Sequence, residues 1–219
     1  MRVQPINRAL CKDWCLNKHY ARRMPPITYA FGLFIRGKME GICTFGTPVS
    51  HTLRTLFDGY KLMELNRLVT NESVPKNSLS RLVSGSLRLM PKPLVVVSYA
   101  DTSKGHHGYI YQATNWIYTG LSAEFKDYYI KGKEHLHNGT IMDMSRGQEN
   151  RVQWLRDKFG YDLITIDRPR KHRYFYFLGS KNQRKDMTNK LPYKVEPYPK
   201  GDNERYDASY EPPTQTHLF

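Results

Sequence analysis

The chain lacks the features that place a protein in or across a membrane. None of its apolar runs approaches the roughly 18 residues that a transmembrane helix needs. No long basic amphipathic helix is present, and the start, MRVQPINRALCKDW, has no apolar segment long enough for a signal peptide. We therefore expect no membrane partner.

Cysteine is also scarce. The chain has 3 Cys, of which Cys11 and Cys15 stand four residues apart in a helical pattern. This usage argues against a disulfide framework and fits a reducing cytoplasm. We expect both cysteines to pack in the interior rather than to bind metal.

Several common motifs are missing. The sequence contains no GxGxxG and no P-loop lysine, so neither a dinucleotide-binding fold nor a nucleoside triphosphatase is supported. It has no cluster of spaced carboxylates, which argues against a metal-dependent nuclease. No internal repeat is visible either, which leaves a single unrepeated domain as the starting hypothesis.

Acidic residues are too few to balance the basic ones. Lys and Arg number 34 against 20 Asp and Glu, which gives a net charge of +14 and a pI near 9.7. A positive field attracts polyanions, so nucleic acid is the first partner to consider. The alternative is a generic basic surface, because charge alone carries no specificity.

A chain of 219 residues can bury a sizeable core in one domain. From residue 180 onward the apolar content drops, and Pro, Lys, Asn, Asp and Tyr dominate. The sequence therefore predicts a domain at residues 1–179 and an extended, basic, Pro- and Tyr-rich arm at residues 180–219, packed on or near the domain.

Apolar spacing within the domain predicts alternating strands and helices. We expect a hairpin over residues 28–46, a strand over 62–69, a helix starting at 77–78, a strand over 124–136, a helix over 148–159, and a second hairpin formed by 161–166 and 173–178. In the strand at 62–69, Glu64 and Asn66 should face one way and Arg67 the other.

The stretch from 94 to 120 organises the rest. LVVV at 94–97 predicts a strand buried on both faces, the polar loop SYADTSKGHHG follows, and apolar residues recur at helical spacing up to Ile117. Open α/β sheets bind ligands at the carboxyl ends of their strands, which is where Ser98, Asp101 and His106 lie. The alternative is a well-made turn that carries surface polar residues.

Two other segments have both a functional and a structural interpretation. HYARRMPP at 19–26 is either a pocket-lining loop, with His19 as base or metal ligand and Arg22 and Arg23 on phosphates, or a solvated helix exit. RYFYFLG at 173–179 mixes aromatic rings with cations, which suits base stacking beside phosphate contacts or a core strand after a basic turn.

Five stretches together resemble the bacteriophage Mom DNA-modification proteins. They run in order over nearly the whole chain and are long and unusual in composition: HYARRMPPITYAFGLF, ELNRLV, PKNSLS, SYAD with GHHGYIYQATNWIYTG, and PYPKGDNERYD. The resemblance implies an α+β fold similar to the GCN5-related N-acetyltransferases, with a central mixed, mostly antiparallel sheet flanked by helices.

The resemblance also implies an activity. Members convert adenine N6 in phage DNA to a bulky carbamoyl-type derivative, methylcarbamoyl or acetamido, which blocks restriction endonucleases. An acetyl-CoA or related acyl donor and a bound iron are associated with the family. The protein is then expected in the cytoplasm of the infected bacterial host, acting on double-stranded DNA with a flipped or unpaired adenine.

Carried onto this sequence, the resemblance suggests a catalytic set. We expect proton handling by His19 or Asp101, leaving-group or oxyanion help from Tyr20, Ser98 or Tyr111, and anion binding by Arg67. A metal would be held by His19 and Asp101, or by His106 and His107.

Binding residues follow from the same comparison. The acyl donor is expected along the end of the strand at 62–69 and the start of the next helix: Leu68, Val69, Lys76, Asn77, Ser78 and Ser80, with Lys104 and Gly105 as a second loop. The usual glycine-rich pyrophosphate loop of these acyltransferases is missing from VPKNSLS. DNA is expected at Arg22, Arg23, His106, His107, Trp116, Arg170, Lys171 and Arg173, with Trp116, Tyr109 or Tyr118 stacking on the base.

Competing functions remain at this point. The same fold could transfer an acetyl group from acyl-CoA to a protein or small-molecule amine, and a non-catalytic basic binding module is a further alternative. The sequence leaves the oligomeric state open, a homodimer included.

Overall fold

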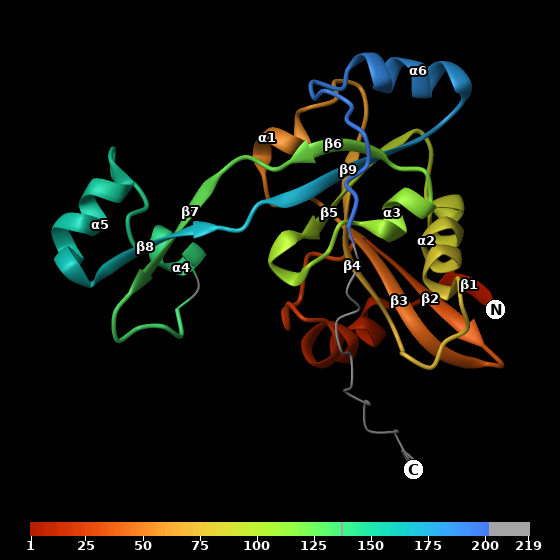
Figure 1. Ribbon diagram of the computed structural model, residues 1–219, viewed down its shortest axis with the longest axis horizontal. Coiled ribbons are helices and arrows are strands. Elements are labelled where there is room, and N and C mark those ends of the chain that lie inside the picture. Colours follow the sequence, from red (N-terminus) through yellow and green to blue (C-terminus); the bar gives the residue numbers. More distant parts are fainter. Residues whose placement is uncertain (137, 202–219) are drawn as a thin grey trace, which may run out of the picture. The chain divides into compact units, whose positions relative to one another are not determined.

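The computed structural model describes residues 1–136 and 138–201. The chain divides into two compact units: unit 1 comprises residues 1–121 and those from 172 onward, and unit 2 comprises residues 122–171 (Figure 1). This division does not coincide with the predicted boundary at residue 179, because unit 2 is an insertion with its own small core.

Unit 1 is built on one seven-stranded sheet. Its order is β1 (Arg2–Pro5), β2 (Tyr29–Ile35), β3 (Lys38–Gly46), β4 (Leu62–Thr70), β5 (Leu94–Asp101), β9 (Lys171–Leu178) and β6 (Ile117–Leu121). Four neighbouring pairs are antiparallel and β4 pairs with β5 in parallel. The predicted fold class, α+β with a mixed, mostly antiparallel sheet flanked by helices, is confirmed.

Helices cover both faces of this sheet. Along β5, Leu94 and Val96 join the core beneath α2 (Ser78–Leu89) and α3 (Tyr109–Ala113), whereas Val95 and Val97 join the core that contains Met187 of α6 (Lys181–Asn189). Successive strand residues point to opposite faces, so α2 and α6 lie on opposite sides (Figure 1). The predicted double burial of this strand is confirmed.

The N-terminal segment covers the β2–β4 part of the face opposite α2. Here η1 (Arg8–Cys11) and the π-helical turn η2 (Trp14–Lys18) bury Cys11, Trp14 and Cys15 against Ile42 and Val69. Both cysteines are free and buried, as predicted. The short helix α1 (His51–Arg54) precedes β4.

The helix predicted to continue to Ile117 ends at Ala113. Asn115 takes a left-handed conformation with φ 61°, which stops the helix, and Ile117 then begins β6. Spacing alone could not separate these two elements, since both are short and apolar.

The predicted second hairpin is wrong. β8 (Leu163–Arg168) pairs with β7 (Phe125–Ile130), and β9 pairs with β6. The β6–β9 pair belongs to the seven-stranded sheet and the β7–β8 pair to a separate two-stranded sheet. Strands β8 and β9, although neighbours in sequence, are therefore in different sheets. The strand predicted over 124–136 likewise ends at Ile130, because Gly132 turns the chain at φ 77° before α4 (Asn138–Asp143).

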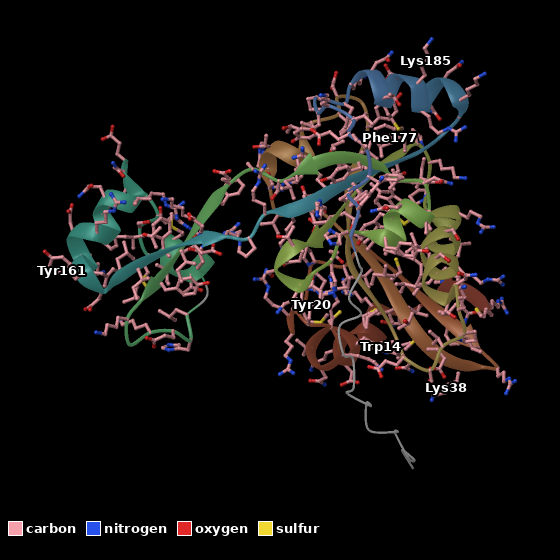
Figure 2. All side chains as sticks on the ribbon, viewed as in Figure 1. Trp14, Tyr20, Lys38, Tyr161, Phe177 and Lys185 are labelled. Atoms are coloured by element: carbon pink, nitrogen blue, oxygen red, sulfur yellow. The ribbon has the colours of Figure 1, made fainter. Side chains whose placement is uncertain are left out.

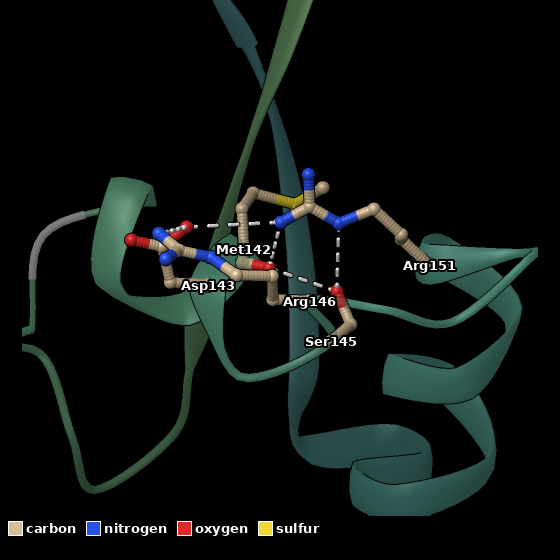
Figure 3. Close-up of polar contacts among 5 residues, drawn as sticks. All are labelled: Met142, Asp143, Ser145, Arg146 and Arg151. Carbon is tan, nitrogen blue, oxygen red and sulfur yellow. Dashed lines mark hydrogen bonds and ion pairs between the residues drawn. The ribbon is translucent and has the colours of Figure 1, made fainter.

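Unit 2 has a core of its own. Ile130, Ile141 and Leu155 are buried between the β7–β8 ribbon, α4 and α5 (Arg151–Phe159), which the short η4 (Gly160–Asp162) follows. Arg151 joins the two helices by donating to the Met142 carbonyl and, at 3.3 Å, to Ser145 Oγ (Figure 3). Tyr161 in η4 is fully exposed (Figure 2).

An extended arm was predicted from residue 180 onward, but the segment is not extended throughout. It begins with α6, whose start carries a capping box between Ser180 and Gln183. Residues 191–201 then follow edge strand β6, with Glu196 N donating to Tyr118 O at 3.0 Å and Tyr198 Oη to Trp116 O at 2.6 Å. Of the PYPKGDNERYD stretch (197–207), the part from residue 202 onward lies outside the described residues.

Candidate functional site

The site forms where β4 and β5 separate. The two strands pair only from Leu62 opposite Val95 to Glu64 opposite Val97, although β4 continues to Thr70 and β5 to Asp101. Beyond Glu64, the β5-facing backbone edge of β4 has no partner strand among the described residues. The sheet therefore opens into a fork.

Ser98 closes the base of this fork. Its Oγ lies 2.8 Å from the Leu65 carbonyl oxygen and 2.8 Å from Tyr111 Oη. A carbonyl can only accept, so Ser98 donates to Leu65 and Tyr111 donates to Ser98. Ser98 is 1% exposed, and burial raises the pKa of Tyr111, which keeps its proton. Both residues hold the fork from inside the core.

Removing this buried link should cost stability. We expect Ser98→Ala to lower the free energy of unfolding by about 1–3 kcal/mol, because it strands the Leu65 carbonyl and the Tyr111 hydroxyl. Tyr111→Phe keeps the Ser98–Leu65 bond and should cost less. Urea denaturation of both variants measures the difference, and an unchanged Ser98→Ala protein would contradict the assignment.

A π-helical turn delivers His19 to the fork. His19 N donates to Trp14 O at 2.8 Å, five residues back, and Arg22 N then donates to His19 O at 2.9 Å. Arg22 sits at φ 40°, a conformation that is rare without glycine. Such π-turns and strained residues gather at functional sites.

The backbone also fixes the tautomer of His19. Its Nδ1 accepts the Ala21 N–H at 3.1 Å. The neutral ring therefore carries its proton on Nε2 and presents a donor there. A metal can bind Nε2 only when the proton is on Nδ1, and in that tautomer Nδ1 could not accept the Ala21 N–H.

Tyr20 lies at the centre of the cluster. Its ring stacks on His19 with centroids 4.3 Å apart and meets His106 edge-on at 5.8 Å. Burial raises the pKa of Tyr20, the charge of Asp101 raises it further, and Arg67 partly opposes them. The phenol therefore stays protonated and can donate a hydrogen bond.

Arg67 and Asp101 supply opposite charges beside Tyr20. Arg67 donates to Asn66 O at 2.6 Å and to Arg23 O at 2.7 Å, and burial lowers its pKa. Its buried Nε has no hydrogen-bond partner among residues 1–136 and 138–201. Asp101 Oδ1 accepts from Ser103 N at 3.0 Å and Oγ at 2.7 Å.

The pattern in β4 differs from the alternation expected. Thr44 pairs with Arg67 and Phe45 with Leu65, so Asn66 is an extra residue in a bulge. A bulge shifts the alternation by one position. Arg67 therefore lies near Glu64, whose carboxylate raises the pKa of Arg67. Cys15 and Tyr20 raise this pKa as well.

Sequence reasoning missed His172. This residue is 8% exposed, its Nδ1 lies 2.7 Å from Tyr118 Oη, and its ring is 5.6 Å from that of His107. Burial lowers its pKa below 6.5, and His107 lowers it further. Alternation along β9 puts His172 on the same face as buried Tyr174, which is the signal that could have found it.

The lowered pKa of His172 predicts acid sensitivity. The unfolded chain takes up this proton near the ordinary pKa of 6.5, whereas the folded chain resists it, so stability falls as pH drops through that window. We expect His172→Asn, which can still accept from Tyr118, to lose less stability between pH 8 and pH 5. Thermal unfolding at several pH values measures this, and parallel curves would contradict it.

Several predicted DNA contacts are not placed to touch a base. Trp116 is fully buried and Tyr118 is 6% exposed, so neither ring can stack on DNA without unfolding the core. Tyr109 is 64% exposed. Arg173 donates to Thr119 Oγ1 and O at 2.9 Å and lies over the Tyr193 ring at 3.4 Å.

The other basic candidates are distributed over both units. In unit 2, Arg170 donates to Ser122 O at 2.7 Å and faces Glu124, and Lys171 N donates to Ser122 Oγ. In unit 1, Arg22 and Arg23 are exposed next to the cluster. His107 lies in the α3 entry loop, where Tyr174 Oη donates to its carbonyl.

The predicted donor-binding residues are spread over the end of β4, the start of α2 and the turn after β5. Leu68 is half-buried and Val69 is buried in the N-terminal core. Asn77, at φ 66°, precedes α2 without a side-chain cap; Ser78 Oγ donates to Pro75 O, and Ser80 Oγ to Asn77 O. Lys76 is exposed; so is Lys104, whose turn η3 (Thr102–Lys104) ends at Gly105 with φ 63°.

Charge is concentrated in unit 1. Residues 1–121 and 172–201 contain twenty-three Lys and Arg against eight Asp and Glu, whereas residues 122–171 contain ten against eight. The field that attracts a polyanion therefore arises from the unit that carries the cluster.

Neither a group of metal ligands nor a membrane-spanning helix occurs among the described residues. No three His, Cys, Asp or Glu side chains in this part of the chain are grouped as metal ligands. Nor does any helix within it have the length and apolarity needed to span a bilayer.

Comparison with known sequences gives one consistent result. The model of the Mom protein family matches residues 1–200. The protein named Methylcarbamoylase mom from Escherichia phage Mu is 33% identical over 211 residues, which cover 91% of this chain and 84% of that protein.

Solved structures similar to this one are acetyltransferases. Arabidopsis thaliana NAA60 in complex with acetyl-CoA matches with a TM-score of 0.46 and 10% identity over 81% of this chain and 99% of that one. A GNAT family acetyltransferase from Elizabethkingia anophelis with acetyl-CoA bound matches with a TM-score of 0.44 and 8% identity over 81% and 97%.

Proposed function

The chain belongs to the Mom protein family, and from this premise we propose that it transfers an acyl group to N6 of adenine in DNA. The product would be a carbamoyl-type derivative, and the name of the phage Mu relative, Methylcarbamoylase mom, suggests a methylcarbamoyl group. The modification would protect phage DNA from restriction in the cytoplasm of the infected host.

One observation carries this proposal. His19 and Tyr20, Arg67, and Asp101 with His106 come from three separate segments and meet at the open end of the β4–β5 fork. Donors, a carboxylate and a guanidinium thus converge in a unit with a large excess of positive charge. This combination suits group transfer on a polyanionic substrate.

The exocyclic amine of adenine is a weak nucleophile because it is conjugated with the ring. Its attack on a carbonyl carbon requires removal of a proton and stabilisation of charge on the carbonyl oxygen. We assign removal of the proton to Asp101, because it is a carboxylate and its negative charge acts directly on Tyr20 in the cluster. His19 is the weaker candidate, since its Nδ1 already holds the Ala21 N–H.

Tyr20 is the best placed donor for the developing oxyanion. Its phenol keeps its proton, and Arg67 beside it favours negative charge nearby. Ser98 and Tyr111, the other candidates, are committed to each other and to Leu65 in the core. His19 Nε2–H would orient the substrate from the other face of the Tyr20 ring.

A thioester related to acetyl-CoA, whose acyl group carries the carbamoyl nitrogen, would supply the activated carbonyl carbon when bound: the adenine amine would bond to this carbon as the thiolate leaves. The chain fits such a donor along β4: the edge that faces β5 beyond Leu65 offers peptide groups to an extended amide-bearing arm. The start of α2, without a side-chain cap at Asn77, offers backbone N–H groups to phosphates.

Iron does not fit the residues predicted for it. His19 with Asp101, or His106 with His107, supplies only two ligands, and no group of three His, Cys, Asp or Glu occurs among the described residues. Nδ1 of His19 and Oδ1 of Asp101 also already accept hydrogen bonds. We therefore assign no step of the reaction to iron.

The target adenine pairs inside a duplex, so it must be flipped out or taken from melted DNA, at a cost of a few kcal/mol.

The proposed function is tested by mass spectrometry of nucleosides from plasmid DNA of cells that express the chain. We expect a deoxyadenosine derivative of increased mass and resistance of the plasmid to restriction enzymes. Unchanged deoxyadenosine with acylated proteins or small amines would favour an ordinary amine acetyltransferase instead.

A further inference from the structure

A groove beside the cluster is not used by the proposed reaction. It has a volume of about 420 Å³ and lies between η1 and the chain that leads into β2. One wall carries Arg8, Ala9 and Lys12, and the other carries Met24, Pro25 and Ile27. Its size is within the range of small-molecule sites.

Both walls are held in place by hydrogen bonds. Asn66 Nδ2 donates to Pro26 O at 2.8 Å, and Arg67 Nη2 donates to Arg23 O at 2.7 Å, so the bulge of β4 fixes one wall. On the other wall, Ala9 N donates to Asn7 Oδ1 at 2.9 Å. The groove is therefore preformed.

The lining combines cations with an apolar surface. Arg8 and Lys12 are exposed at the rim, Met24 is 41% exposed, and no carboxylate lines the groove. Asp13 is the nearest acid in sequence, but it does not line the groove, and its carboxylate accepts a hydrogen bond from Asn17. Cations beside an apolar floor match a phosphate attached to a sugar and base.

The groove and the cluster share one segment of chain. Tyr20 and Met24 are four residues apart, so their Cα atoms lie within about 14 Å of each other, and Arg67 of the cluster binds the carbonyl of Arg23 directly. A strand that delivers an adenine to Tyr20 would pass the groove within one or two nucleotides.

We propose that this groove holds a nucleotide that flanks the modified adenine on the same strand. Arg8 and Lys12 bind its phosphate, and Met24, Pro25 and Ile27 contact its sugar and base. The inference rests on the proposed function and adds to it a site that influences the sequence context of modification, since deaminases and related enzymes set context through flanking nucleotides.

The test compares two double variants that lose the same charge. Arg8→Gln with Lys12→Gln removes the rim, and Arg36→Gln with Lys38→Gln removes two exposed cations at the tip of the β2–β3 hairpin, well away from Tyr20 (Figure 2). We measure affinity for an adenine-containing oligonucleotide against salt concentration. We expect the groove variant to weaken binding at least tenfold and to reduce the salt slope by about two, and the hairpin variant to do neither.

A further variant tests the apolar wall formed by Met24, Pro25 and Ile27. Met24→Ala should change which bases flank the modified adenines, read by sequencing of modified plasmid, without changing the salt slope. Equal losses of affinity in the two double variants, or unchanged context in Met24→Ala, would overturn the assignment. If the groove variant alone loses DNA affinity while wild-type protein leaves deoxyadenosine unchanged, the groove stands as a DNA site and the proposed reaction fails.

Discussion

Tyr20→Phe should lower the rate of adenine modification by about 10²- to 10³-fold, the usual effect of removing one oxyanion donor. The ring that stacks on His19 and meets His106 is kept, and only the hydroxyl is lost. Because burial and Asp101 both raise the pKa of Tyr20, the wild-type phenol is a donor over the whole physiological pH range. The modified fraction of deoxyadenosine over time gives the rate.

Two measurements separate this effect from a structural one. Thermal unfolding and DNA affinity of Tyr20→Phe should stay close to those of the wild type, since the ring keeps its contacts with His19 and His106. A variant that modifies adenine at the wild-type rate would remove the Tyr20 hydroxyl from the reaction. If Tyr20→Phe unfolded at a much lower temperature and lost activity for that reason, the Tyr20 hydroxyl would have a structural role.

Asp101→Asn should be more severe, with a rate lowered by about 10²- to 10⁴-fold. The amide oxygen of Asn can still accept from Ser103 N and Oγ, so the turn after β5 should persist. What disappears is the negative charge and the ability to take a proton. Modified deoxyadenosine is again the measured quantity.

The electrostatic effect of Asp101 provides an independent readout. Its charge raises the pKa of Tyr20, so removing that charge should lower this pKa toward its ordinary value of 10.0. Ultraviolet titration of wild type and variant, each compared with its Tyr20→Phe counterpart, isolates this phenol. An unchanged titration would mean that Asp101 is too distant from Tyr20 to act with it.

The sequence predicted the parts of the fold that follow local rules. The strand at Leu94–Val97 is buried on both faces because its residues are apolar without alternation, and the helix at Ser78 follows a clear apolar stripe. Strand pairing was predicted less well: β8 and β9 are neighbours in sequence but pair in different sheets. That choice depends on a small core in unit 2 that local patterns do not reveal.

The site was predicted as residue types rather than as geometry. Residue spacing and the family resemblance indicated His19, Tyr20, Arg67 and Asp101, and the structure brings them together. The tautomer of His19 depends on a turn that closes onto Nδ1, and the direction of Arg67 depends on the bulge at Asn66. Neither has a sequence signature.

Aromatic residues show the same limit. Trp116 in an aromatic stretch suggested base stacking, yet its ring is the largest fully buried side chain of the described residues. Composition cannot tell a core ring from a stacking ring, because both are apolar surfaces with similar neighbours.

The β4–β5 fork is the proposed reaction centre. Nucleoside mass spectrometry of plasmid DNA from cells expressing wild type, Tyr20→Phe, Asp101→Asn, or the Arg36 and Lys38 double variant tests it directly. We predict a heavier deoxyadenosine derivative in the wild type and the double variant, and almost none in the two fork variants. A derivative formed equally by all four proteins, or by none, would contradict the account.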